Sequence, residues 1–171
     1  MLCIAVAFLL PAGLSAAGDS ELDRATLRGL KAVNVVIDHI DPQLPKEFVP
    51  PADLQARMED RLKSGGIVVD SDATEFVALQ VAAVRSGGGS RVIGRISGGI
   101  TFALSFTIGL YQPVLLSRDH NVRTVTKTWE VETILMVDPK NLKQAWMDSI
   151  DDLTARFIAA YRSVNPTAPK P

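Results

Sequence analysis

Cysteine is nearly absent from this chain of 171 residues, which contains a single one, Cys3. One cysteine cannot build a disulfide framework or a thiolate metal site, so both are excluded. An excess of charge is absent too, because 18 lysines and arginines stand against 19 aspartates and glutamates. The formal charge of −1 lacks the basic excess of a nucleic-acid binder and the acidic excess of a disordered tail.

Recognisable catalytic motifs are absent as well, since the sequence has no nucleophile elbow, no HExxH and no paired cysteines. A glycine run occupies residues 87–89, but strand-like residues follow it, whereas a phosphate-binding loop needs a helix there. We therefore predict no catalytic residue, no cofactor-binding or metal-binding residue, and no cofactor.

Two histidines keep an enzymatic alternative open. His39 and His120 lie beside carboxylates, namely Asp38, Asp41 and Asp119. Histidine with aspartate is a combination used for metal binding and acid–base chemistry. At strand ends such residues commonly form turns, which is the role we predict here. The alternative is a hydrolase or metal-dependent enzyme that uses these side chains.

The first seventeen residues carry no charge and include an apolar run over residues 4–10. Small residues close this segment at Ser15, Ala16 and Ala17, the pattern of a secretory signal peptide, although no lysine or arginine precedes the apolar run. We predict cleavage between Ala17 and Gly18; the alternative is a buried apolar strand or helix. Cys3 precedes the apolar run, so a lipid anchor is not expected.

Hydrophobic periodicity predicts two helices. Apolar residues every four positions predict the first over residues 51–64, with Asp53–Arg57 and Glu59–Lys63 as ion pairs. Steps of three and four predict the second over residues 139–164, with Phe157 on the face that covers the core. The opposite face of this helix carries three acids, which we interpret as solvated: Asp148, Asp151 and Asp152.

Alternating polarity predicts strands over residues 31–40, 67–69, 76–84, 97–117 and 122–136. The segment 97–117 has 21 uncharged residues, long enough for a transmembrane helix. Its period of two instead predicts one long strand, bent near Gly109 or Pro113. A membrane-inserting β-hairpin would share this pattern and remains an alternative.

These elements predict an α+β fold, an antiparallel twisted sheet of four to five strands in the order β-α-β-β-β-β-α. Both amphipathic helices are expected on one face of the sheet. The predicted organisation is a signal peptide at 1–17, a leader at 18–29, a single domain at 30–165 and a disordered tail at 166–171.

The segments 30–36, 63–67, 128–129 and 157–166 together resemble a family of exported bacterial proteins without assigned activity. The element order is also similar to the amino-terminal domain of the Tol system's periplasmic protein and related envelope lipoprotein modules. The chain departs from these in lacking a lipid-anchor cysteine and in its glycine-laden segment 85–99. The resemblance implies a periplasmic or secreted, non-catalytic binding or assembly module of the cell envelope. Its expected partner is an envelope protein, with no nucleic acid and no stable membrane insertion.

Overall fold

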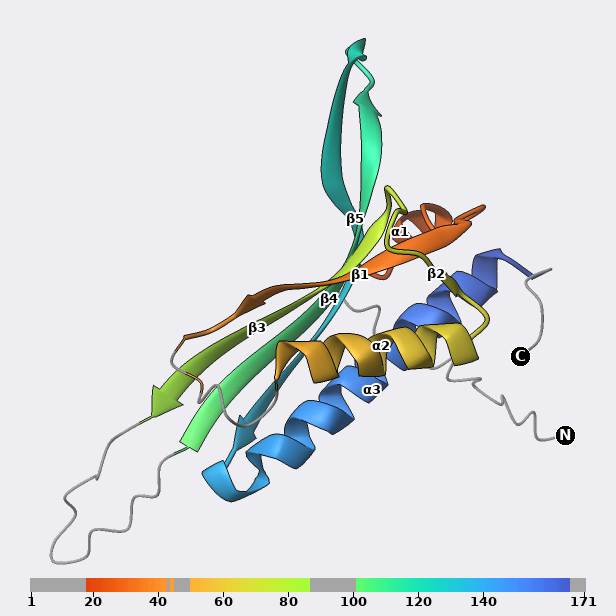
Figure 1. Cartoon of the computed structure of the whole chain (residues 1–171). Helices are drawn as coiled ribbons and strands as arrows, with labels where there is room; N and C mark the ends of the chain where they lie inside the picture. The colour runs from red at the N-terminus through yellow and green to blue at the C-terminus, as the bar shows by residue number, and fades with distance from the viewer. Residues whose placement is uncertain (1–17, 43, 45–49, 87–100, 167–171) are drawn as a thin grey trace, which may run out of the picture.

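The protein is described by a computed structural model over residues 18–42, 44, 50–86 and 101–166 (Figure 1). Five strands form one sheet in the order β2-β1-β3-β4-β5, and helices α2 and α3 pack on one of its faces (Figure 1). The elements in chain order are α1 Glu21–Ala25, β1 Ala32–Ile40, α2 Pro51–Ser64, β2 Val68–Val69, β3 Phe76–Ser86, β4 Thr101–Leu116, β5 Asp119–Val137, the 3-10 turn Pro139–Asn141 and α3 Leu142–Val164.

The predicted α+β class, with two helices on one face of the sheet, is confirmed. Strands β3, β4 and β5 are antiparallel, whereas β1 runs parallel to both of its neighbours, β2 and β3. The parallel pairs arise because the chain leaves β1 through α2 before returning to the sheet as β2. The sheet is therefore mixed and mostly antiparallel.

The long uncharged segment forms strand β4, as its alternation predicted. Its even-numbered apolar residues from position 102 to 110 are all buried, with 0–6% of their surface exposed: Phe102, Leu104, Phe106, Ile108 and Leu110. These side chains lie in the protein core, where they are not available to lipid. The register with β5 shifts between Leu110 and Tyr111, close to the predicted bend. Residues 97–100 lie outside the described part of the chain.

Helix α3 covers the core through the predicted apolar face. Phe157 is fully buried, and its ring meets the buried ring of Trp129 edge to face at 5.1 Å. One end of the helix is held similarly, because Trp146 packs edge to face on Phe106 at 5.4 Å. Such aromatic pairs stabilise a core beyond the area that they bury.

One prediction for α3 is wrong: Asp151 does not lie on a solvated face. Its carboxylate accepts hydrogen bonds of 2.7 and 2.6 Å from Arg57 of α2, so Arg57 pairs across the two helices and not with Asp53. Periodicity locates the apolar face of a helix but does not show which neighbour lies along its flank. Asp148 and Asp152 are exposed as predicted, and the predicted pair between Glu59 and Lys63 is present.

The segment 18–29 is part of the folded body. Ser20 caps helix α1 in a reciprocal capping box with Asp23, and Leu27 is fully buried. The side chain of Asn165 donates to the carbonyl of Leu27 at 3.0 Å and accepts from the amide of Gly29 at 2.9 Å. The segment before β1 is thereby joined to the end of α3.

Candidate functional site

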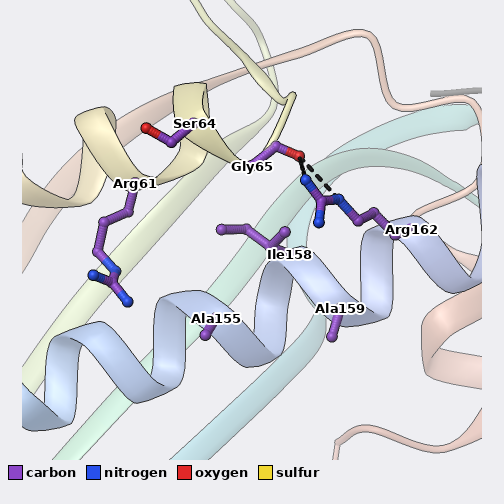
Figure 2. Close-up of a pocket in the computed structure, with 7 residues that line it drawn as sticks. All are labelled: Arg61, Ser64, Gly65, Ala155, Ile158, Ala159 and Arg162. Carbon is purple, nitrogen blue, oxygen red and sulfur yellow. Dashed lines mark hydrogen bonds between the residues drawn. The ribbon is translucent and has the colours of Figure 1, made fainter. Parts of the chain in front are cut away.

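A hollow of 520 Å³ lies between the C-terminal end of α2 and the C-terminal half of α3 (Figure 2). We call it the α2–α3 pocket. Its walls combine small or apolar side chains with two cations, and no acid is among its lining residues: Arg61, Ser64, Gly65, Ala155, Ile158, Ala159 and Arg162.

Small residues create this hollow. Helix α2 ends at Gly65, where a Cβ atom would lie 2.7 Å from Cδ1 of Ile158, so glycine permits the close approach of α3. The next residue, Gly66, has a positive φ of 84°, a conformation common just after a helix and favourable for glycine. On α3, Ala155 and Ala159 leave open the space that longer side chains would fill.

The two arginines of the pocket have different partners. Arg162 donates from Nε and Nη2 to the carbonyl of Gly65, at 3.1 and 2.7 Å (Figure 2). Arg61 lies with Nη1 3.2 Å from the carboxylate of Asp151, which already accepts two bonds from Arg57. The hydrogen bond with Asp151 raises the pKa of Arg57, whereas Arg61 makes the longer contact to the shared carboxylate.

The two histidines considered as catalytic candidates are far apart. His39 pairs with Gln80, which lies opposite Thr107 of β4, whereas His120 follows the residue that pairs with Leu116. The nine steps along β4 from position 107 to 116 span about 30 Å at about 3.3 Å per residue. The two histidines cannot act on one substrate atom.

The aspartates beside these histidines have local roles. Asp41 accepts from the amide of Ala83 at 3.3 Å, which joins the end of β1 to β3. Asp119 accepts from the amide of Asn121 at 3.0 Å in the turn between β4 and β5, as an aspartate in a turn does. In the described part of the chain, no three His, Cys, Asp or Glu residues are grouped so that they could hold a metal ion.

A second hollow, of 240 Å³, includes His39 and residues of β3 and β4. Two of its polar side chains bond to neighbouring residues of the sheet. Gln80 donates to Asp38 and Ser105 donates to Glu132, both at 2.5 Å. These bonds link adjacent strands and do not connect a nucleophile to a histidine base.

The strands β4 and β5 continue beyond the rest of the sheet as a two-stranded ribbon (Figure 1). We call residues 112–126 the arm; its pairs include Pro113 with Val125 and Leu115 with Arg123. Every residue from position 117 to 127 is exposed. Leu115, Val122 and Val125 expose 58%, 43% and 52% of their surface, so the arm presents apolar side chains to solvent.

The sequence interpretation missed the arm. It predicted both strands and the turn between them, but not that they project. The signal lies in strand length, because β4 and β5 have 16 and 19 residues whereas β1 and β3 have 9 and 11. Strands longer than their neighbours must extend past the end of the sheet.

No family model matches the chain, and no curated protein matches it. Similar solved structures include a PelC dodecamer from Paraburkholderia phytofirmans, at 13% identity over 74% of this chain and 84% of that chain, with a TM-score of 0.40. The rare lipoprotein B from Shewanella oneidensis is 12% identical over 78% and 97%, with a TM-score of 0.38. A minor lipoprotein from Acinetobacter baumannii is 10% identical over 83% and 98%, with a TM-score of 0.35.

Two of these similar structures are bacterial lipoproteins. The expected similarity to the amino-terminal domain of the Tol protein is not confirmed. Among its described residues, no helix has the length and apolar composition required to cross a membrane.

Proposed function

We propose that this protein is an exported, periplasmic, non-catalytic binding or assembly module of the bacterial cell envelope, which holds a protein partner through its arm. The exposed apolar side chains of the arm carry this proposal. An isolated two-stranded ribbon is only marginally stable in water, and exposed apolar clusters bordered by polar groups mark interaction sites. The uncharged segment 1–17 supports export, although it lies outside the described residues.

The arm has two different faces. Residues directly opposite each other in a sheet share a face, and alternate pairs along the strands return to it. Pro113 with Val125 and Leu115 with Arg123 therefore form one apolar face with a cation at its border. The pair between Val114 and Thr124 lies on the other face. The first face is the one that we expect the partner to cover.

The base of the arm is held by the body of the protein. The side-chain amide of Gln112 donates to the carbonyl of Thr26 at 3.0 Å and to the hydroxyl of Thr128 at 2.8 Å. This anchor fixes the direction of the arm before a partner binds. A preorganised surface loses less entropy on association than a loose one.

Site-specific photo-crosslinking in living bacteria tests this proposal. A photoreactive residue at position 125 should give a discrete adduct with an envelope protein in the periplasmic fraction, and the same residue at the exposed Lys143 position of α3 should not. The double variant Leu115→Ser, Val125→Ser carrying the photoreactive residue at the exposed position 123, on the same face, should lose the adduct that the parent forms there. It should keep its melting temperature, because both replaced side chains are exposed.

Two outcomes would contradict the proposal. Adducts of equal yield from positions 125 and 143 would show that the arm is not a specific surface. Recovery of the protein from the cytoplasm with its first residue intact would refute export, whatever the crosslinking shows.

A further inference from the structure

The α2–α3 pocket has more positive charge than its neighbours neutralise. Arg61 shares the single carboxylate of Asp151 with Arg57, which holds it by the two shorter bonds. The partner of Arg162 is a neutral backbone carbonyl, that of Gly65. The negative charge of Asp148 also raises the pKa of Arg57, but Asp148 does not line the pocket. Charge complementarity therefore favours an anionic ligand in this pocket.

The spacing of the two guanidinium groups favours two anionic groups over one. Arg61 reaches α3 at Asp151, whereas Arg162 reaches back to Gly65, which packs against Ile158. Positions 151 and 158 of α3 are seven steps apart, about 10 Å at about 1.5 Å per residue. A polyproline II segment returns to the same side every third residue, after about 9 Å. Carboxylates at positions i and i+3 of such a segment match this spacing.

The wall between the two arginines suits a small apolar residue. Ile158 lies between Arg61 and Arg162, and Ala155 and Ala159 complete this part of the pocket (Figure 2). Arginine has five N–H donors, so each end of the pocket can take one carboxylate through the N–H groups that do not face Gly65 or Asp151. The arrangement therefore has an order: a cation, an apolar centre and a second cation.

We infer that the α2–α3 pocket binds an acidic peptide segment of a protein partner, with two carboxylates three residues apart. One carboxylate lies on Arg61 and the other on Arg162, with two small apolar residues between them. This site is separate from the arm and goes beyond the proposed function. Either surface can fail its test while the other passes.

Nuclear magnetic resonance titration of the ¹⁵N-labelled protein tests the inference. The probe is the peptide acetyl-Gly-Glu-Pro-Ala-Glu-Gly-amide, in which proline favours the extended helix. We expect saturable shifts confined to the amides of residues 61–66 and 155–162. The matched peptide with glutamine in place of both glutamates should bind at least tenfold more weakly, because it lacks both charges.

Variants separate this site from general charge attraction. Arg61→Gln should weaken binding of the probe about fivefold. Arg156→Gln removes the same charge from an exposed position of α3, where Arg156 pairs with Asp152 at 2.7 Å, and should leave binding unchanged. Ala159→Leu fills the pocket without changing its charge and should also weaken binding. The retained melting temperature of each variant shows that it is folded.

Three results would overturn the inference. In the first, Arg61→Gln and Arg156→Gln weaken binding of the probe equally. In the second, the glutamine peptide binds as tightly as the glutamate peptide. In the third, the probe causes no chemical-shift changes at millimolar concentration. Inorganic phosphate that produces the same shifts at the same concentration would identify a small-anion site and refute the peptide ligand. The arm variant Leu115→Ser, Val125→Ser should bind the probe normally, so failure at the arm is distinguishable from failure at the pocket.

Discussion

The indole Nε1 of Trp129 donates a hydrogen bond of 2.8 Å to Oδ1 of Asp19, a residue 110 positions earlier in the chain. The same carboxylate accepts two bonds from Arg24, at 2.7 and 2.6 Å. Trp129 is 1% exposed and packs against Phe157. The segment before α1 therefore supplies the polar partner of a ring in the centre of the core.

Replacing Asp19 with alanine should lower the free energy of unfolding by about 1–3 kcal/mol, because the buried indole N–H loses its acceptor. Urea denaturation at pH 7 measures this change. Glu21→Ala removes an exposed carboxylate two residues later, at the start of α1, and should change stability by less than about 0.5 kcal/mol. Equal effects of the two variants would show that the bond to Trp129 contributes nothing.

The contribution of Asp19 should also depend on pH. Burial raises the pKa of Asp19, but the hydrogen bonds from Arg24 and Trp129 outweigh it and hold the pKa below its ordinary value of 3.8. Because the folded-state pKa is the lower one, ionised Asp19 stabilises the fold fully above pH 3.8. The stability difference between the parent and Asp19→Asn should shrink as the pH falls through 3.8 toward the folded-state pKa. A difference that stays constant down to pH 2 would contradict this.

Phe157→Ala should lower the free energy of unfolding by about 3–5 kcal/mol, because it opens a cavity beside Trp129. Asp151→Ala removes the ion pairs with Arg57 and Arg61 at the surface between the two helices and should cost at most about 1 kcal/mol. Thermal unfolding of both variants beside the parent compares them. If Phe157→Ala kept the parent's melting temperature, α3 would not be the cover of the core.

The sequence contained most of the fold and little of the candidate site. The alternation of apolar and polar residues in β4, and the spacing of apolar residues in α3, both follow from burial. Each pattern lies within the residues of its own element. The direction of β1 depends on where the chain re-enters the sheet after α2, and no residue within β1 records that. Likewise, the carboxylate that Arg61 shares lies on another helix. The α2–α3 pocket arises where two elements meet, so periodicity within either element could not predict it.

His39→Ala and His120→Ala should each change the free energy of unfolding by less than about 0.5 kcal/mol, because both side chains are exposed. Metal analysis of protein purified without added ions should give the same result for the parent and both variants. Stoichiometric metal in the parent that is lost in either variant would restore the enzymatic alternative.

The mature protein recovered from the periplasm should begin at Gly18, which N-terminal sequencing determines. The prediction depends on the small residues that end the apolar segment, with Ala17 last. A first residue elsewhere in the chain would move the predicted cleavage point. An intact Met1 on cytoplasmic protein would remove the argument for export.

The parallel pairing of β1 with β3 determines an order of folding. Asn34 pairs with Phe76 across the whole of α2, whereas Leu116 pairs with Asp119 across a turn. Since the entropy cost of closing a loop rises with its length, the tip of the arm is the cheapest place for the chain to begin pairing. A chain that emerges from its N-terminus presents β1 first, yet β1 has no neighbour in the sheet until β2 and β3 have emerged. Strand β1 is therefore synthesised first but stays unpaired longest. During that interval its apolar residues are exposed and must be protected from aggregation.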